Sequence, residues 1–267
     1  MTRRRFLTRM AGTAAATAVG RAAARDPAGL SGRRPNVVLI LTDDQGPGDM
    51  AWAGHPHLKT PHLDALRAQS LWFSAFQVSP TCAPTRCALL TGRHEFFSGV
   101  THTIFERERM SLNARTLPQA LKSAGYATGI FGKWHLGDED AYQPGQRGFD
   151  EVYIHGGGGI GQTYPGSCGD VPNNQYANPV LRHNGRFVRT KGFCTDLFFD
   201  QALRWIDTHR ASGAPFFCCL TPNAPHSPYH APDAWKKRYV AAGLDDAAAG
   251  FCGMVENIDA NVGKLLA

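Results

Sequence analysis

A cysteine, a proline and an arginine stand close together between Cys82 and Gly92, and their types and spacing suit hydrolysis of an anionic ester. Pro84 has the fixed φ of a first helical turn, no breaker follows, and Gly92 suits a helix end, so the segment predicts a short helix. Cys82 would lie at the helix N-terminus, where free N–H groups and the dipole favour an anion. Arg86 would add a rigid fork of donors. The segment therefore predicts a nucleophile beside a sulfate or phosphate site.

Two carboxylates form a second chemical group, directly after a predicted strand. Asp43 and Asp44 follow the apolar run 36–42, which is typical of a strand buried on both faces of a parallel sheet. Ligands collect at the carboxyl ends of such strands, and adjacent carboxylates there need a cation or an arginine. Hard oxygen ligands suit Ca²⁺ or Mg²⁺. The pair predicts a metal site, and a helix cap or a solvated turn is the alternative for the dipeptide alone.

Basic side chains follow two further predicted strands. Lys133 and His135 come after the strand at 126–131, and an extended chain would point both side chains to one face. An ammonium and an imidazole there can neutralise anionic charge and transfer protons. His226 comes after the strand at 215–220, in a loop that two prolines stiffen.

Two stretches resemble the signatures of one enzyme family, the type I sulfatases. The segment from Cys82 resembles the first signature, Cys-x-Pro-Ser/Thr-Arg followed by a short apolar helix and Thr-Gly. The segment from Gly125 to His135 resembles the second, although Phe131 is bulkier than the usual residue. The resemblance runs from about Pro35 to the last residue. It implies an alkaline-phosphatase-like fold and a sulfuric ester hydrolase of the arylsulfatase type.

The resemblance also implies the cofactors and partners. In the family, the motif cysteine is oxidised after translation to formylglycine, whose hydrated aldehyde attacks sulfur, and Cys82 matches that residue. Asp43 and Asp44 match the first pair of metal ligands, so a Ca²⁺ ion, with Mg²⁺ as the alternative, is expected on these side chains and residue 82. The implied partners are a small-molecule or glycan sulfate ester and a formylglycine-generating or sulfatase-maturing enzyme.

The resemblance assigns roles to the other polar residues as well. Arg86, Lys133 and His135 would stabilise charge beside the aldehyde. His226 matches a histidine that contacts the sulfate or the leaving oxygen, so it is the expected general acid. His135 could share that role, and His230 is close enough in sequence to help.

The chain departs from the family pattern at its end. A complete site of this type has a second Asp-Asn metal pair and another lysine on later strands, but the sequence contains no Asp-Asn dipeptide. Residues 256–261 are polar, yet they fall on a helix with an apolar stripe and are interpreted as structural. The sequence is therefore expected to hold an incomplete N-terminal catalytic domain over residues 36–267, with little activity and poor solubility. Two alternatives stay open: a phosphate or phosphonate monoester hydrolase of the same superfamily, and a non-catalytic fragment.

The elements that must position these residues alternate between strands and helices. Strands are expected at 36–42, 71–78, 126–131 and 215–220, with helices between and after them. This alternation predicts an α/β fold with a mixed, mostly parallel sheet covered by helices on both faces. Residues 155–180 interrupt the pattern with a long loop rich in glycine, which is interpreted as a lid or a substrate-facing loop.

The amino-terminal residues account for the basic charge of the chain. The 267 residues carry a formal net charge of +6, and residues 1–25 contain six arginines and no acidic residue, which leaves the remainder neutral. A nucleic-acid partner is therefore not expected.

Residues 1–25 resemble a twin-arginine signal peptide, followed by a linker at 26–35. A periplasmic or secreted bacterial protein is expected, with the export machinery as a partner and no stable membrane anchor, because the apolar stretch is short.

Seven cysteines follow the leader, and six remain when Cys82 is set aside. An oxidising compartment permits disulfides, and Cys168 with Cys194 is the candidate pair. Cys218 and Cys219 lie in an apolar strand and are expected to be buried thiols. No Cys-x-x-Cys occurs, so a structural zinc site is not expected. The three histidines between residues 55 and 62 are expected at the surface.

Overall fold

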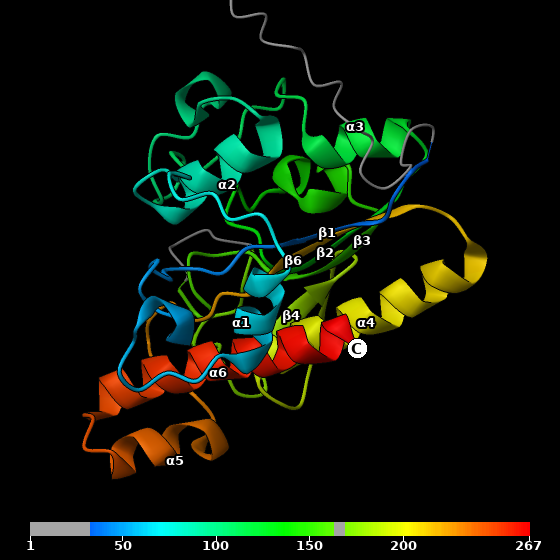
Figure 1. Cartoon of the computed structure of the whole chain (residues 1–267). Coiled ribbons are helices and arrows are strands. Elements are labelled where there is room, and N and C mark those ends of the chain that lie inside the picture. The colour runs from blue at the N-terminus through cyan, green and yellow to red at the C-terminus, as the bar shows by residue number, and fades with distance from the viewer. Residues whose placement is uncertain (1–32, 163–168) are drawn as a thin grey trace, which may run out of the picture. The chain divides into compact units, whose positions relative to one another are not determined.

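A six-stranded sheet organises the described part of the chain, residues 33–162 and 169–267 (Figure 1). The predicted signal peptide and most of the predicted linker lie outside these residues. The strand order is β1-β6-β2-β3-β4-β5. Strands β1, β6, β2 and β3 are parallel, and β4 and β5 add an antiparallel hairpin. The strands are β1 (Val37–Ile40), β2 (Ala127–Lys133), β3 (Glu151–His155), β4 (Val180–His183), β5 (Arg186–Arg189) and β6 (Phe216–Thr221).

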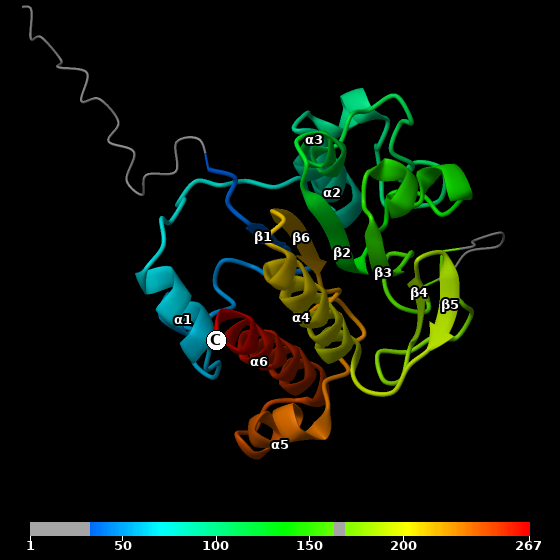
Figure 2. The ribbon, with the colours of Figure 1, turned by 90° about the vertical axis from the view of Figure 1, so that its right-hand side faces the viewer.

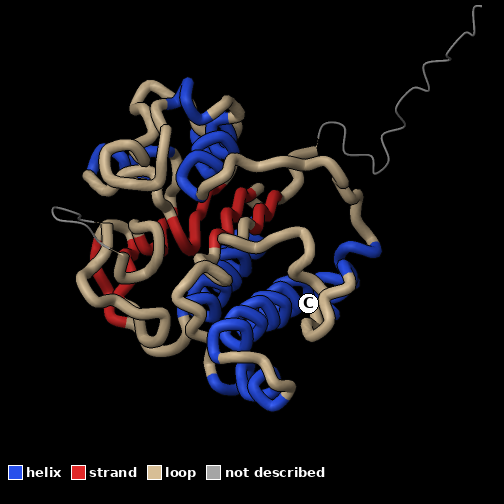
Figure 3. The backbone as a smooth tube through the Cα atoms, turned by 90° about the vertical axis from the view of Figure 1, so that its left-hand side faces the viewer, coloured by secondary structure: helices blue, strands red, loops and turns tan. Residues whose placement is uncertain are grey.

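Helices cover both faces of this sheet (Figures 1–3). Helices α2 and α3 lie on one face, and α4 and α6 lie on the other, with α1 and α5 packed against α6. The predicted α/β fold with a mostly parallel sheet is therefore confirmed. The helices are α1 (Pro61–Ala68), α2 (Cys82–Thr91), α3 (Leu117–Ser123), α4 (Cys194–Ser212), α5 (Asp233–Ala241) and α6 (Asp246–Leu266). Short 3-10 helices are η2 (Ala51–Ala53), η3 (Glu95–Ser98), η4 (Asp140–Tyr142) and η5 (Pro144–Arg147).

The central strand β6 shows why a continuous apolar run is needed in this position. Successive side chains of a strand point to opposite faces, and both faces of β6 are covered. Phe216, Cys218 and Leu220 join the cluster under α4 and α6, whereas Phe217 and Cys219 join the cluster under α2. The two adjacent cysteines are buried free thiols, as the sequence predicts.

The predicted strand at 71–78 is wrong. This segment connects α1 to α2 without joining the sheet, and its side chains are exposed, with Leu71 at 88% and Phe76 at 71%. An apolar, aromatic composition favours a strand only where a partner strand supplies hydrogen bonds. Within the described residues, the segment instead borders a cavity of about 770 Å³ beside β1, which is the edge strand of the sheet.

The hairpin of β4 and β5 was not predicted, although the sequence carries its signal. Asn184 and Gly185 join the two strands with positive φ values of 47° and 86°. A two-residue turn of this kind is favoured by Asn-Gly, because its twist matches that of the flanking strands. The hairpin begins at Val180, the residue at which the predicted loop of residues 155–180 ends.

A close approach between β2 and β6 fixes the carboxyl edge of the sheet. Gly132 has φ of +129°, and a Cβ atom there would lie 2.1 Å from the carbonyl oxygen of Thr221. Only glycine combines that backbone conformation with this spacing. The next residue, Lys133, accepts hydrogen bonds at its carbonyl oxygen from Arg86 of α2 at 2.8 Å and from the Thr221 hydroxyl at 2.9 Å. Three elements therefore meet at one backbone position.

The polar residues of α6 hold neighbouring elements in place. Asp259 accepts a hydrogen bond from the backbone N–H of Leu63 in α1, at 2.8 Å. Asn257 and Asn261 both donate to the carboxylate of Asp196 in α4, at 2.8 and 2.7 Å. Because these side chains bond α1 and α4, they have a structural role in α6, in agreement with the interpretation of residues 256–261.

Candidate active site

Helix α2 begins at Cys82 and ends before Gly92, which adopts the left-handed conformation with φ of 64°. The predicted helix is therefore confirmed, and the half-buried Cys82 lies in its first turn. The thiol Sγ lies 3.2 Å from Nδ1 of His135, which follows β2. A helix from one side of the sheet and the end of a central strand thus bring these two groups together.

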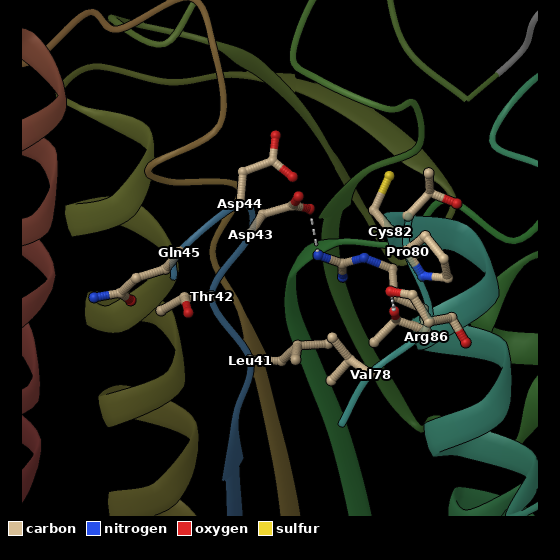
Figure 4. A pocket seen from close by; sticks show the side chains of 12 residues that line it. Leu41, Thr42, Asp43, Asp44, Gln45, Val78, Pro80, Cys82 and Arg86 are labelled. Carbon is tan, nitrogen blue, oxygen red and sulfur yellow. Dashed lines mark hydrogen bonds and ion pairs between the residues drawn. The ribbon is translucent and has the colours of Figure 1, made fainter. Parts of the chain in front are cut away.

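Asp43 follows β1, and its carboxylate faces the buried guanidinium of Arg86 (Figure 4). Its Oδ2 atom accepts from Nη2 of Arg86 at 2.8 Å and pairs with Nζ of Lys133 at 2.6 Å. Burial alone would raise the pKa of Asp43, but the charges of Arg86 and Lys133 outweigh it and hold this pKa well below its usual range. Nη1 of Arg86 donates to the Lys133 carbonyl and Nη2 donates to Asp43, so both terminal nitrogens of this guanidinium bind groups of the protein.

His135 is held by contacts on both sides of its ring. Nδ1 faces Cys82, and Nε2 lies 3.0 Å from the carbonyl oxygen of Thr103 and 3.1 Å from Oε2 of Glu108. Burial alone would lower the pKa of His135, but the hydrogen bonds to Cys82 and Glu108 outweigh it and raise this pKa. The residue has φ of 61°, so the chain turns after β2 rather than staying extended.

Glu108 is the residue at this site that sequence reasoning missed. It lies in an irregular loop and precedes the signature that contains His135, so neither periodicity nor a motif marks it. Only the fold shows that its buried carboxylate reaches the imidazole.

His226, in the loop after β6, lies beside Asp44. Its Nε2 atom is 3.7 Å from Oδ2 of Asp44. The Tyr176 hydroxyl donates to the carbonyl oxygens of His226 at 3.1 Å and Ser227 at 2.9 Å, and the backbone N–H of Asp43 donates to the carbonyl of Ala224. These bonds fix the loop after β6 against the end of β1.

Asp43, Asp44 and His226 form one group of potential metal ligands. Their donor atoms lie within 4.8 Å of one another. Two carboxylates and an imidazole at this spacing fit a divalent cation, and the carboxylate oxygens suit Ca²⁺ or Mg²⁺. Cys82, the other ligand expected from the sequence, is not in this group, although Cys82 and both aspartates line the same cavity of about 360 Å³.

The structure also bears on the other histidines and on the cysteine pair that the sequence suggests. His55, His57 and His62 form no metal group among the described residues, and His62 is exposed, as expected. His230 is exposed and packs beside the Tyr176 ring. Cys194 is buried and forms no disulfide with another described cysteine, and its predicted partner Cys168 lies outside the described residues, so this pairing stays a prediction.

The glycine-rich run after β3 packs directly against His135. The backbone N–H of His135 donates to the carbonyl of Gly156 at 3.0 Å. A Cβ atom on Gly158 would lie 3.2 Å from the His135 ring, so glycine lets this backbone contact the imidazole. The base of the loop thus forms a wall of the site, and its role as a substrate-facing lid stays a prediction.

The environment of Cys82 predicts selective alkylation of its thiol. Burial alone would raise the thiol pKa, but the His135 hydrogen bond and the Lys133 charge lower it to about 7. Because the thiolate is the reactive form, labelling of the unmodified native chain by iodoacetamide should rise as the pH increases through about 7. Cys87, whose pKa burial raises to about 11, should stay unlabelled. Peptide mass spectrometry measures both, with a urea-unfolded sample as the control; a Cys82 midpoint above pH 8 would contradict the prediction.

Comparisons with known proteins agree with the fold and the motifs. The family model described as Sulfatase matches residues 35–267. The N-acetylgalactosamine-6-sulfatase of Rattus norvegicus is 32% identical over 255 residues, covering 87% of this chain and 46% of the relative. Arylsulfatase J of Mus musculus is 33% identical, covering 80% of this chain and 36% of the relative. The chain spans about half the length, or less, of these curated relatives.

Solved structures show the same architecture. The crystal structure of Ps i-CgsB has a TM-score of 0.76 and 29% identity, covering 88% of this chain and 54% of that chain. The phosphonate monoester hydrolase of Agrobacterium radiobacter, with a TM-score of 0.54 and 17% identity, shares the fold. No helix in the described ranges is long and apolar enough to cross a membrane. The match to the family model extends over residues 35–267, which is well over half of the chain, and the chain therefore belongs to the sulfatase family.

Proposed function

We propose that residues 36–267 carry the nucleophile and the first metal pair of a sulfuric ester hydrolase of the arylsulfatase type. One observation carries this proposal: Cys82, at the N-terminus of α2, lies 3.2 Å from His135 and lines one cavity with the Asp43–Arg86 pair. A nucleophile, a proton acceptor and a buried charge cluster are thus assembled around a site that suits an anion.

Each site residue has its own role in the proposed reaction. Oxidised to formylglycine, residue 82 supplies a hydrated aldehyde as the nucleophile, and a Ca²⁺ ion on Asp43 and Asp44 supplies positive charge for the sulfate. The free N–H groups of α2 and the ammonium of Lys133 stabilise negative charge at the same place. His135 faces residue 82 through Nδ1 and exchanges a proton with it. His226, beside Asp44, protonates the leaving oxygen.

The substrate proposed here is a glycan sulfate ester, with small aryl sulfates as surrogate substrates. The rat relative is named as an N-acetylgalactosamine-6-sulfatase, and Ps i-CgsB has been crystallised in complex with k-i-k-neocarrahexaose. Both names refer to carbohydrates, which supports a sugar as the group bearing the sulfate. The proposal includes a formylglycine-generating or sulfatase-maturing enzyme as a partner, and twin-arginine export to the periplasm or the medium.

Matched substrates test the proposed function. The chain is coexpressed with a sulfatase-maturing enzyme, and the peptide containing residue 82 is checked by mass spectrometry for the aldehyde. Turnover of an aryl sulfate should exceed that of the aryl phosphate with the same leaving group by at least about tenfold, which is about 1.4 kcal/mol of activation free energy. Preference for the phosphate would support the phosphoester alternative. Absence of both turnover and Ca²⁺ binding would support the non-catalytic alternative.

A further inference from the structure

Glu108 places a buried carboxylate next to His135. The residue lies in the loop between η3 and α3 and is only 2% exposed. Its backbone N–H donates to the carbonyl of Ile104 at 3.1 Å, and two residues later Met110 donates to the carbonyl of Leu136 at 3.2 Å. The loop is therefore tied both to itself and to the segment that carries His135. A charged side chain in such a place is costly unless it is paired.

The partners of Nε2 determine where the neutral His135 ring carries its proton. Nε2 faces the carbonyl oxygen of Thr103 at 3.0 Å and the carboxylate of Glu108 at 3.1 Å. Both oxygens are hydrogen-bond acceptors, so the nitrogen between them must be the N–H donor. The other nitrogen of the neutral ring, Nδ1, then carries a lone pair, and it points at residue 82.

We propose that Glu108 is a positioning residue that fixes the tautomer and orientation of His135. The inference rests on the proposed function for its consequence: with Nε2 protonated, Nδ1 can accept a proton from the group at position 82. In that transfer, the bond from the proton to residue 82 breaks and an N–H bond forms at Nδ1. The ring becomes an imidazolium, whose positive charge lies beside the Glu108 carboxylate. Glu108 acts through the histidine and has no contact with the substrate.

A second acid on the same loop gives a matched control. Glu106 precedes Glu108 by two residues, its side chain is 66% exposed, and it pairs with Arg109 at 3.8 Å. Glu106→Gln removes the same charge from the same loop away from His135. Glu108→Leu fills the space of the carboxylate but removes the acceptor, whereas Glu108→Gln keeps an oxygen acceptor without the charge.

Nitrogen NMR of the full chain labelled with ¹⁵N-histidine tests the proposal directly. Every protein in this series, the native chain included, carries Cys82→Ser, because the Cys82 thiolate would itself accept a hydrogen bond from Nδ1 at alkaline pH, whereas a serine hydroxyl stays uncharged. His135→Asn identifies the ring signals, and spectra are recorded at alkaline pH, where the ring is neutral. The native chain, Glu106→Gln and Glu108→Gln should show a single tautomer protonated at Nε2. Glu108→Leu should show signals averaged between the two tautomers.

If folded Glu108→Leu, checked by its amide spectrum, keeps the native ring signals, Thr103 alone fixes the ring and the proposal is wrong. If Glu108→Leu does not fold, Glu108→Ala takes its place: averaged ring signals in folded Glu108→Ala support the proposal, and native ring signals there overturn it.

Turnover gives a second, separate readout. In matured protein, Glu108→Leu should lower kcat for an aryl sulfate by on the order of 10- to 100-fold with little change in KM, because the effect is on proton transfer. Glu106→Gln should leave both parameters unchanged. Equal kcat values in the two variants would count against the proposal. If the native chain itself turns over no sulfate ester, the proposed function fails, while the NMR result still decides the role of Glu108.

Discussion

Asp43→Asn is expected to lower the free energy of unfolding by about 3–5 kcal/mol, the cost of leaving buried charge without its partner. The carboxylate is the counter-ion of both Arg86 and Lys133, and all three side chains are at most 4% exposed. Asparagine keeps the shape but leaves two cations facing a neutral amide. Urea unfolding should therefore show a lower midpoint with an unchanged slope.

The neighbouring residue supplies the control for this experiment. Asp44 has a side chain that is 59% exposed, and its Oδ2 atom lies 3.7 Å from Nε2 of His226. Exposed pairs of this kind contribute little, so Asp44→Asn should cost under about 1 kcal/mol. Equal losses in the two variants would show that burial of the charge cluster does not govern stability.

Acid should reveal the same contribution of Asp43 in the unaltered chain. Its pKa in the folded state is lower than in the unfolded state, where an aspartate titrates near about 3.9. The stabilisation is therefore fully present above about pH 4 and is lost as the pH falls through the folded-state pKa. The difference in unfolding free energy between the native chain and Asp43→Asn should shrink accordingly in acid.

Cys82→Ala is expected to lower kcat for a sulfate ester by on the order of 10⁴-fold or more, because the proposed nucleophile is removed. Cys87, on the same helix, is fully buried in the core cluster under α2, and burial raises its pKa to about 11. Cys87→Ala should keep kcat within a fewfold of the native value after maturation. Steady-state turnover of an aryl sulfate measures both variants, and substantial activity in Cys82→Ala would remove this residue from the mechanism.

Much of the site follows from a single rule about parallel strands. Asp43, Lys133 and His226 come after three different strands in the sequence, and β1, β2 and β6 prove to be neighbours in the sheet. The carboxyl ends of neighbouring parallel strands meet at one edge, so residue type and strand prediction were enough to group these side chains. The helix that begins at Cys82 could also be predicted from local sequence, because proline and glycine stand at positions typical of a helix start and a helix end.

Other features depend on contacts that no local pattern encodes. Glu108 reaches His135 from an irregular loop, and Arg86 bonds Asp43 and the Lys133 backbone, which only the packed structure can reveal. The error at 71–78 has a related cause, because strand composition does not specify a pairing partner. Composition and periodicity indicate which secondary structure a segment favours, but the segments that pack against it determine whether that structure forms.

The contacts at Lys133 hold the residues proposed for catalysis together, apart from the loops that would select the substrate. Because α2, β2 and β6 are joined there through backbone and buried charge, the groups proposed for catalysis form one rigid unit that tolerates little adjustment. Two loops lie next to this unit: the glycine-rich run after β3, which packs against His135, and the turn that carries His226, which lies beside Asp44. For the proposed hydrolase, exchange of these loops is therefore expected to change which ester is accepted while the reacting groups keep their geometry.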